Sequence, residues 1–178
     1  MKRSELEHLI RAAGAVANED RLVIIGSQAI LGQFPNAAGL LCQSMEADMI
    51  PIDHPEKWNL IDGVLGQGSP FHETFGYYAD GVDESTAILP QGWQQRLVPL
   101  VNENTRGVLG LCLEVHDLLI TKYCAGREKD LAFTATAVAS GMVEKEHLLD
   151  LLCGTNLTTL HRELIRKRIE ADFARDYS

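Results

Sequence analysis

The feature that most restricts the fold is a short apolar run, Leu22 to Ile25, which ends at Gly26 and Ser27. Four consecutive apolar residues, three of them β-branched, are typical of a strand that lies at the centre of a sheet and is covered on both faces. The segment from Ser27 to Phe34 then has helical character and stops at the following proline. This strand–turn–helix order predicts a domain in which helices pack against a sheet.

The bulk composition bounds the size and class of the protein. With 178 residues, the chain is long enough for one ordinary domain, or for one α/β core with a small helical annex. Its 46% of hydrophobic and 23% of charged residues are typical of a globular protein. The net charge of −9 argues against a general electrostatic attraction to nucleic acid, although a local basic cluster can still hold an RNA end or a nucleotide.

The first two thirds of the chain are predicted to contain one more helix and several strands. An amphipathic helix is expected over residues 4–17, with Ser4 as its cap and Glu7 reaching back to it. Strands are expected at 44–52, around 74–82, and on both sides of a turn at 102–107. Residues 63–93 are rich in turn signals, and their "GVLGQG" is rejected as a phosphate loop because no lysine follows it and no clear strand precedes it.

From Val115 onward the pattern becomes helical, with Gly126 and Gly141 as expected helix ends and a last helix that runs to Asp176. We therefore predict an α/β core over residues 1–112 and a helical region over residues 113–178, which together form one compact unit. Basic residues of the last helix alternate with acidic ones, so a salt-bridged exposed face is favoured there over an RNA-binding one.

Two acidic residues lie on one strand candidate. Glu46 and Asp48 are one residue apart, so both side chains point to the same side of a strand, about 7 Å apart along the chain. Carboxylates in such a place need a partner, and a pair of hard oxygen donors suits Mg²⁺, which binds a few carboxylates together with substrate phosphates. The turn at Gly26 and Ser27 offers backbone N–H groups at a helix start, which favours a phosphate.

A third feature completes a known pattern: Asp117 and Lys122, followed by the run Arg127 to Asp130. Together with "GSQAILG" and "SMEAD", these residues resemble the DNA polymerase β-type nucleotidyltransferase superfamily. Within it, the chain is similar to small bacterial nucleotidyltransferases akin to the AbiE-type toxins of toxin–antitoxin and phage-defence systems. The resemblance covers most of residues 20–135.

The resemblance implies an α+β nucleotidyltransferase fold, in which a small mixed β-sheet is flanked by helices and followed by a helical C-terminal region. It implies a Mg²⁺-dependent transfer of a nucleotidyl group from a nucleoside triphosphate to an acceptor. The residues that it implies are Glu46 and Asp48 as metal ligands, Asp48, Asp80, Lys122 and Asp130 as catalytic residues, and Gly26, Ser27, Lys122, Arg127 and Lys129 as nucleotide-binding residues. Asp80 is the candidate third carboxylate, and Glu103 is its rival.

Two departures from the superfamily pattern leave an alternative open. The gap between Ser27 and Glu46 is long, which implies an inserted loop, and the first ligand is Glu where Asp is commoner. Either is compatible with an inactive relative that senses nucleotides or binds a protein. The chain is thus interpreted as an enzyme, with this binding module as the alternative.

The expected partners are a nucleoside triphosphate, an RNA, protein or small-molecule acceptor and, for a toxin, an antitoxin; a membrane is not among them. No apolar segment approaches the length of a membrane span, and the first residues lack the apolar core of a signal peptide. The four cysteines form no CxxC pair and are expected to be free thiols, which indicates a cytoplasmic location. The six histidines show no HxxxH spacing, so a metal hydrolase is not expected.

Overall fold

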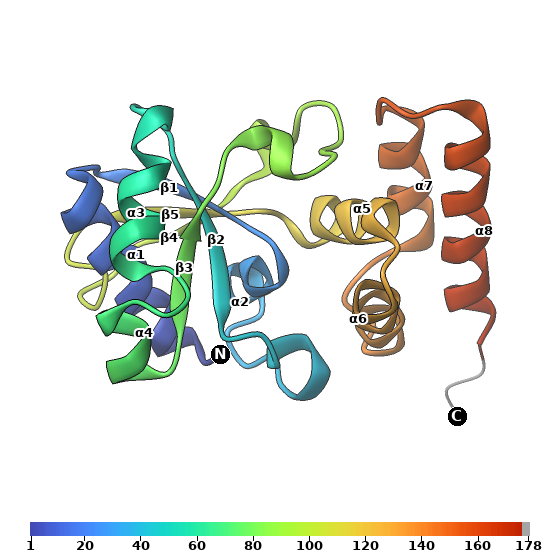
Figure 1. The fold of residues 1–178 in the computed structure, drawn as a ribbon. Coiled ribbons are helices and arrows are strands. Elements are labelled where there is room, and N and C mark those ends of the chain that lie inside the picture. The colour runs from blue at the N-terminus through green and yellow to red at the C-terminus, as the bar shows by residue number, and fades with distance from the viewer. Residues whose placement is uncertain (176–178) are drawn as a thin grey trace. The chain divides into compact units, whose positions relative to one another are not determined.

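The computed structural model describes residues 1–175, and the chain divides into two compact units (Figure 1). The first unit consists of residues 1–86 and 97–114 and contains the sheet, whereas the second consists of residues 87–96 and the chain from Val115 onward. The sequence-based boundary at 112/113 did not assign the segment 87–96 to the helices. Asp176, the expected end of the last helix, lies outside the described residues.

The sheet of the first unit has five strands in the order β3-β2-β1-β5-β4 (Figure 1). The strands are β1 (Arg21–Ile25), β2 (Glu46–Pro51), β3 (Tyr78–Gly81), β4 (Val98–Leu100) and β5 (Leu109–Cys112). β1 pairs antiparallel with β2 and parallel with β5, β2 pairs parallel with β3, and β4 pairs antiparallel with β5. The small mixed sheet is therefore confirmed, with the apolar strand β1 at its centre.

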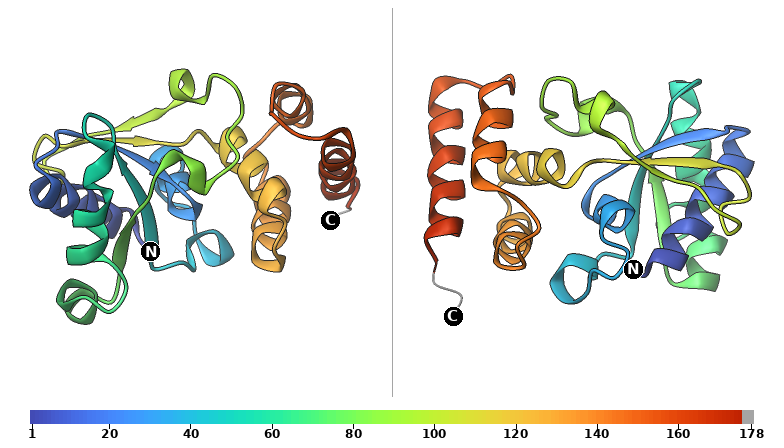
Figure 2. Two further views of the ribbon diagram at one scale, coloured as in Figure 1. Left: turned by 45° about the horizontal axis from the view of Figure 1, so that its top comes forward. Right: turned by 180° about the vertical axis from the view of Figure 1, so that it is seen from behind.

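Three helices cover one face of this sheet: α1 (Arg3–Ala17), α2 (Ile30–Gln33) and α3 (Trp58–Leu65). One strand residue packs against each of these helices on this face. Gly110 lies against Ile10 of α1, Cys112 against Gly32 of α2, and Gly81 against the backbone of Trp58 in α3. Both views in Figure 2 show α1 and α3 side by side. Because successive residues of a strand face opposite ways, Asp80, the neighbour of Gly81, faces away from the helices.

Two helices of the glycine-rich segment were not predicted, α3 and α4 (Pro70–Phe75). Gly63 lies inside α3, and Pro70 occupies the first turn of α4, where a proline's missing N–H does not matter. The hydroxyl of Ser69 caps α4 by accepting a hydrogen bond from the backbone N–H of His72 at 3.2 Å. Residues that usually break helices therefore start one helix here and are tolerated in the other.

The predicted cap of the first helix is wrong. α1 begins at Arg3, and the backbone N–H of Lys2 donates to Glu5 at 2.6 Å. Glu7, which was expected to reach back to Ser4, instead accepts from the side-chain amides of Asn102 and Asn104 at 2.8 and 2.7 Å. The carboxylate of Glu7, which the local pattern assigned to the helix cap, is therefore hydrogen-bonded to the turn between β4 and β5.

A buried carboxylate joins the start of β1 to the segment after β2. Glu19 accepts hydrogen bonds from Lys57 at 2.8 Å and His54 at 2.6 Å, and its side chain is only 2% exposed. Burial alone would raise the pKa of Glu19, but the bonds from Lys57 and His54 lower it below its ordinary value. A carboxyl whose pKa is lower in the folded state stabilises the fold above its unfolded-state pKa, and this stabilisation is lost as the pH falls.

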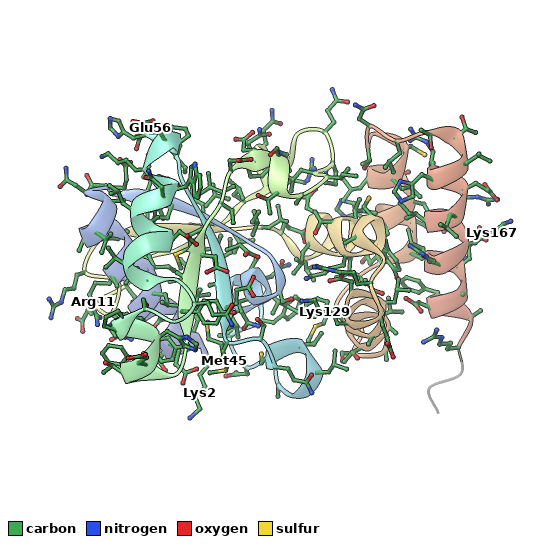
Figure 3. All side chains as sticks on the ribbon, in the orientation of Figure 1. Lys2, Arg11, Met45, Glu56, Lys129 and Lys167 are labelled. Atoms are coloured by element: carbon green, nitrogen blue, oxygen red, sulfur yellow. The ribbon has the colours of Figure 1, made fainter. Side chains whose placement is uncertain are left out.

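We therefore expect the substitution Glu19→Gln to reduce the free energy of unfolding most at pH 7. The difference from the wild type should begin to shrink at a pH of about 4, where the carboxyl of the unfolded state takes up a proton, and should shrink further as the pH falls through the lower folded-state pKa. Urea unfolding between pH 7 and pH 3 measures this, with the exposed Glu56→Gln on the same segment as a control (Figure 3). A difference that stays constant with pH would contradict the assignment.

The second unit is built from α5 (Val115–Ala125), α6 (Glu128–Ala139), α7 (Lys145–Cys153) and α8 (Thr159–Ala174). Gly126 and Gly141 follow α5 and α6 with positive φ angles, so both expected helix ends are confirmed. The segment 87–96 is tied to α5 by Arg96, whose guanidinium donates two hydrogen bonds to Asp117 at 2.7 and 2.8 Å. Asp117 is fully buried, so this bidentate pair explains why the segment belongs to the helical unit.

The face of α8 carries the salt bridges that its charge pattern indicates. Arg166 pairs with Glu163 at 3.0 Å and with Glu170 at 2.9 Å. Arg162 donates to four backbone carbonyls between Leu152 and Leu157 and so closes the end of α7. Lys167 extends into solvent (Figure 3). None of the described helices has both the length and the apolar character that a bilayer crossing requires.

Candidate functional site

Three carboxylates come together on the face of the sheet opposite the helices. Glu46, Asp48 and Asp80 each offer an oxygen, and these oxygens lie within 4.8 Å of one another. Glu46 and Asp48 belong to β2, whereas Asp80 belongs to β3. The parallel register places Asp48 beside Asp80 and Glu46 beside Tyr78. We call Glu46, Asp48 and Asp80 the acidic triad.

The triad is half-buried and electrostatically strained. Burial raises the pKa of Asp80 above its ordinary value, and the negative charges of Glu46 and Asp62 raise it further. A backbone hydrogen bond from Gln67 and the imidazole of His72 offset part of this rise. Carboxylates held this close repel one another, and a bound cation relieves that repulsion.

The donor set fits a small hard cation. Mg²⁺ binds oxygens at about 2.0–2.1 Å in an octahedron, so two ligands on opposite sides of the ion are about 4 Å apart. Triad oxygens within 4.8 Å of one another need only small side-chain adjustments to meet this geometry. Nitrogen and sulfur ligands, which zinc and copper prefer, are absent from the triad. The residues present therefore fit Mg²⁺ or a similar cation such as Mn²⁺.

The glycine–serine corner adjoins the triad. Gly26 has a φ of +71°, and a Cβ at this position would overlap the Oδ2 atom of Asp48. Ser27 begins the 3₁₀ turn η1 (Ser27–Ala29), which leads into α2. Gly26 is thus required both by its backbone conformation and by the carboxylate that lies against it. Gly26 and Asp48, which the sequence analysis proposed as a nucleotide-binding residue and a metal ligand, therefore lie against each other.

We expect Gly26→Ala to displace the Asp48 carboxylate from the triad. Divalent-cation affinity, measured with Mn²⁺, should fall at least about tenfold, as for other changes beside a metal ligand. The matched control is Gly39→Ala, because Gly39 has a similar φ of +61° but open space around its Cβ position. Both variants place an alanine at a positive φ, which strains the backbone, and only Gly26→Ala crowds the triad.

The same Mn²⁺ titration, with urea unfolding of both variants beside it, separates these effects. Equal cation affinities of the two alanine variants would contradict the role assigned to Gly26.

A second group of candidate residues lies in the helical unit. Asp130 at the start of α6 accepts hydrogen bonds from Lys122 of α5 at 3.1 Å and from Arg127 at 2.6 Å. Asp130 is 1% and Lys122 7% exposed, whereas Lys129 is exposed at the surface of α6 (Figure 3). Burial alone would raise the pKa of Asp130, but its bonds to Arg127 and the charge of Lys122 lower it.

The structure separates the rival carboxylate from the triad and adds residues that sequence patterns did not single out. Glu103 is exposed in the turn between β4 and β5, outside the triad. The hydroxyl of Tyr78 donates to Oε2 of Glu46 at 3.3 Å, and the ring of His72 lies against that of Tyr78. Burial and the charges of Glu46 and Asp80 raise the pKa of Tyr78 to about 12, so its hydroxyl stays protonated. The two-residue period of β3 could have predicted that Tyr78 faces the same side as Asp80. Its position beside Glu46 follows from the register of β3 against β2.

The sequence model of one family, described as nucleotidyltransferase of unknown function (DUF6036), matches residues 4–177. Neither the curated proteins nor the solved structures contain a match to this chain.

Proposed function

Because the chain belongs to this family of nucleotidyltransferases of unknown function, we propose that it transfers a nucleotidyl group from a nucleoside triphosphate to a hydroxyl or phosphate acceptor in a Mg²⁺-dependent reaction. The acceptor is an RNA, a protein or a small molecule. The observation that carries the proposal is the acidic triad with Gly26 against Asp48. We assign the site to the DNA polymerase β type, since a Gly-Ser corner, a Glu-x-Asp strand and a third acid meet in one unit.

In the proposed reaction, an acceptor oxygen forms a bond to the α-phosphorus and the bond to pyrophosphate breaks. Asp80 accepts the proton when the acceptor is a hydroxyl, which its position beside Asp48 favours. Glu46 and Asp48 hold the cation, and the backbone at Gly26 and Ser27 binds the triphosphate. When bound, Mg²⁺ supplies charge neutralisation and aligns the reacting oxygens.

Gln28 follows the Gly26–Ser27 corner directly in the chain. Its side chain is fully buried, and neither its amide nitrogen nor its amide oxygen has a hydrogen-bond partner within the described residues. An unpaired buried amide is costly, and such groups are commonly satisfied by a bound water or retained for a role in the site.

The nucleotide roles of Lys122, Arg127, Lys129 and Asp130 follow from the resemblance, and in the helical unit the contacts of Lys122 and Asp130 are those of a buried ion pair. We propose that Lys122 neutralises phosphate charge, that Arg127 and Lys129 bind the nucleotide, and that Asp130 orients Lys122 or Arg127. A toxin role with an antitoxin partner rests on the resemblance alone.

The test is to incubate the protein with each α-labelled nucleoside triphosphate, Mg²⁺ and a cell lysate, and then to separate RNA, protein and small molecules. Label should enter one of these classes with release of pyrophosphate, stop when EDTA removes the cation, and return with added Mg²⁺. Absence of product with all four nucleotides would contradict the enzyme. A rise in melting temperature with nucleotide and Mg²⁺ but without product would instead favour a nucleotide-sensing module, because a specific ligand stabilises the folded state.

A further inference from the structure

Tyr78 bonds to a carboxylate of the acidic triad through its side-chain hydroxyl group. In the parallel β2–β3 register, Tyr78 lies directly beside Glu46, just as Asp80 lies beside Asp48. The four side chains therefore form a square on the sheet face opposite the helices. The hydroxyl of Tyr78 donates a hydrogen bond to Oε2 of Glu46 at 3.3 Å. The bond to Tyr78 does not use Oε1, the other oxygen of this carboxylate.

Glu46 needs such a partner more than an aspartate would. A glutamate has one more rotatable bond than an aspartate, and holding its side chain in one conformation costs more entropy. Its carboxylate also extends one methylene further from the strand than that of Asp48. A hydrogen bond to one carboxylate oxygen restricts the rotation of the whole group before a cation binds.

Tyr78 is itself held in place from two directions. Its backbone N–H donates to the carbonyl of Met45 at 2.9 Å, next to Glu46 in the chain. Its ring lies against the imidazole of His72, with ring centroids 4.6 Å apart. The Nδ1 atom of His72 accepts a hydrogen bond from the backbone N–H of Gly68 at 3.0 Å. Helix α4 and the turn before it therefore support the ring that supports Glu46.

We infer that Tyr78 is a positioning residue, which orients the carboxylate of Glu46 for the divalent cation and compensates for the extra methylene of glutamate at this position. The inference rests on the proposed function, because it assumes that the triad binds a cation. It assigns to α4 a task in the site, namely holding the Tyr78 ring through His72.

The test is cation binding by the whole chain, with Mn²⁺ as the probe and the signal of free Mn²⁺ in electron paramagnetic resonance as the readout. Tyr78→Phe should weaken Mn²⁺ binding about tenfold, the lower end of the range for a residue that bonds to a metal ligand. The matched control is Tyr77→Phe, which also removes one hydroxyl bond, from Tyr77 to Nδ1 of His8 at 2.7 Å. Tyr77→Phe should bind Mn²⁺ as the wild type does.

A second arm uses Glu46→Asp, whose shorter side chain withdraws the carboxylate from the Tyr78 hydroxyl. In this background, Tyr78→Phe should cause no further loss of Mn²⁺ affinity. The inference is overturned if Tyr78→Phe binds as the wild type does, if Tyr77→Phe weakens binding equally, or if the loss persists in the Glu46→Asp background. If the wild type binds Mn²⁺ no better than Asp48→Asn does, the proposed function itself fails together with the inference.

Discussion

Asp48→Asn is expected to reduce nucleotidyl transfer about a thousandfold or more. Asparagine keeps the size of the side chain and its contact with Gly26, but it removes the charge that we propose binds the cation. A metal ion contributes several kcal/mol to charge stabilisation in the transition state, and each 1.4 kcal/mol changes the rate about tenfold. The rate of pyrophosphate release at saturating Mg²⁺ measures the loss.

The fold should survive this substitution, because it removes one of three crowded negative charges. The control is Asp53→Asn, since Asp53 follows β2 and pairs with Arg21 in an exposed salt bridge. This variant should retain nearly the full rate. Comparable losses in the two variants, or an Asp48→Asn variant that is fully active, would show that Asp48 does not hold the reaction's cation.

Asp130→Ala is expected to have the largest effect on stability. Asp130 and Lys122 are both buried, and the substitution removes the Asp130 carboxylate from the ion pair with the ammonium group of Lys122. Removing one member of a buried ion pair typically costs about 3–5 kcal/mol. The exposed pair of Glu163 and Arg166 in the same unit is the comparison, since such pairs contribute only about 0–1 kcal/mol.

Urea unfolding monitored by circular dichroism, with amide hydrogen exchange in α5 and α6, measures the difference between Asp130→Ala and Glu163→Ala. Removing both charges, as in Lys122→Met with Asp130→Leu, should restore much of the stability because apolar side chains replace both members of the buried pair. If Asp130→Ala costs no more than Glu163→Ala, the buried pair does not stabilise the helical unit.

Local patterns failed where contacts between distant segments took precedence. Ser4 and Glu7 had the spacing of a helix cap, but the amides of Asn102 and Asn104 bind Glu7. The glycines and prolines of residues 63–93 indicated turns, whereas the chain forms the end of α3 and the whole of α4 there. The sequence pattern grouped Asp117 with Lys122. It did not indicate that Asp117 pairs with Arg96, which lies 21 residues earlier in a segment with no helical signal of its own.

Local patterns in the sequence were enough to predict the central strand, the helix ends at Gly126 and Gly141, and the shared side of Glu46 and Asp48. All of these follow from local rules: apolar continuity, the positive φ that glycine tolerates, and the two-residue period of a strand. Tertiary contacts were needed to select Asp80 over Glu103 as the third carboxylate of the triad and to place Tyr78 beside Glu46. Both depend on the register of β3 against β2, two parallel strands joined through α3 and α4, and no short-range pattern in the chain encodes such a register.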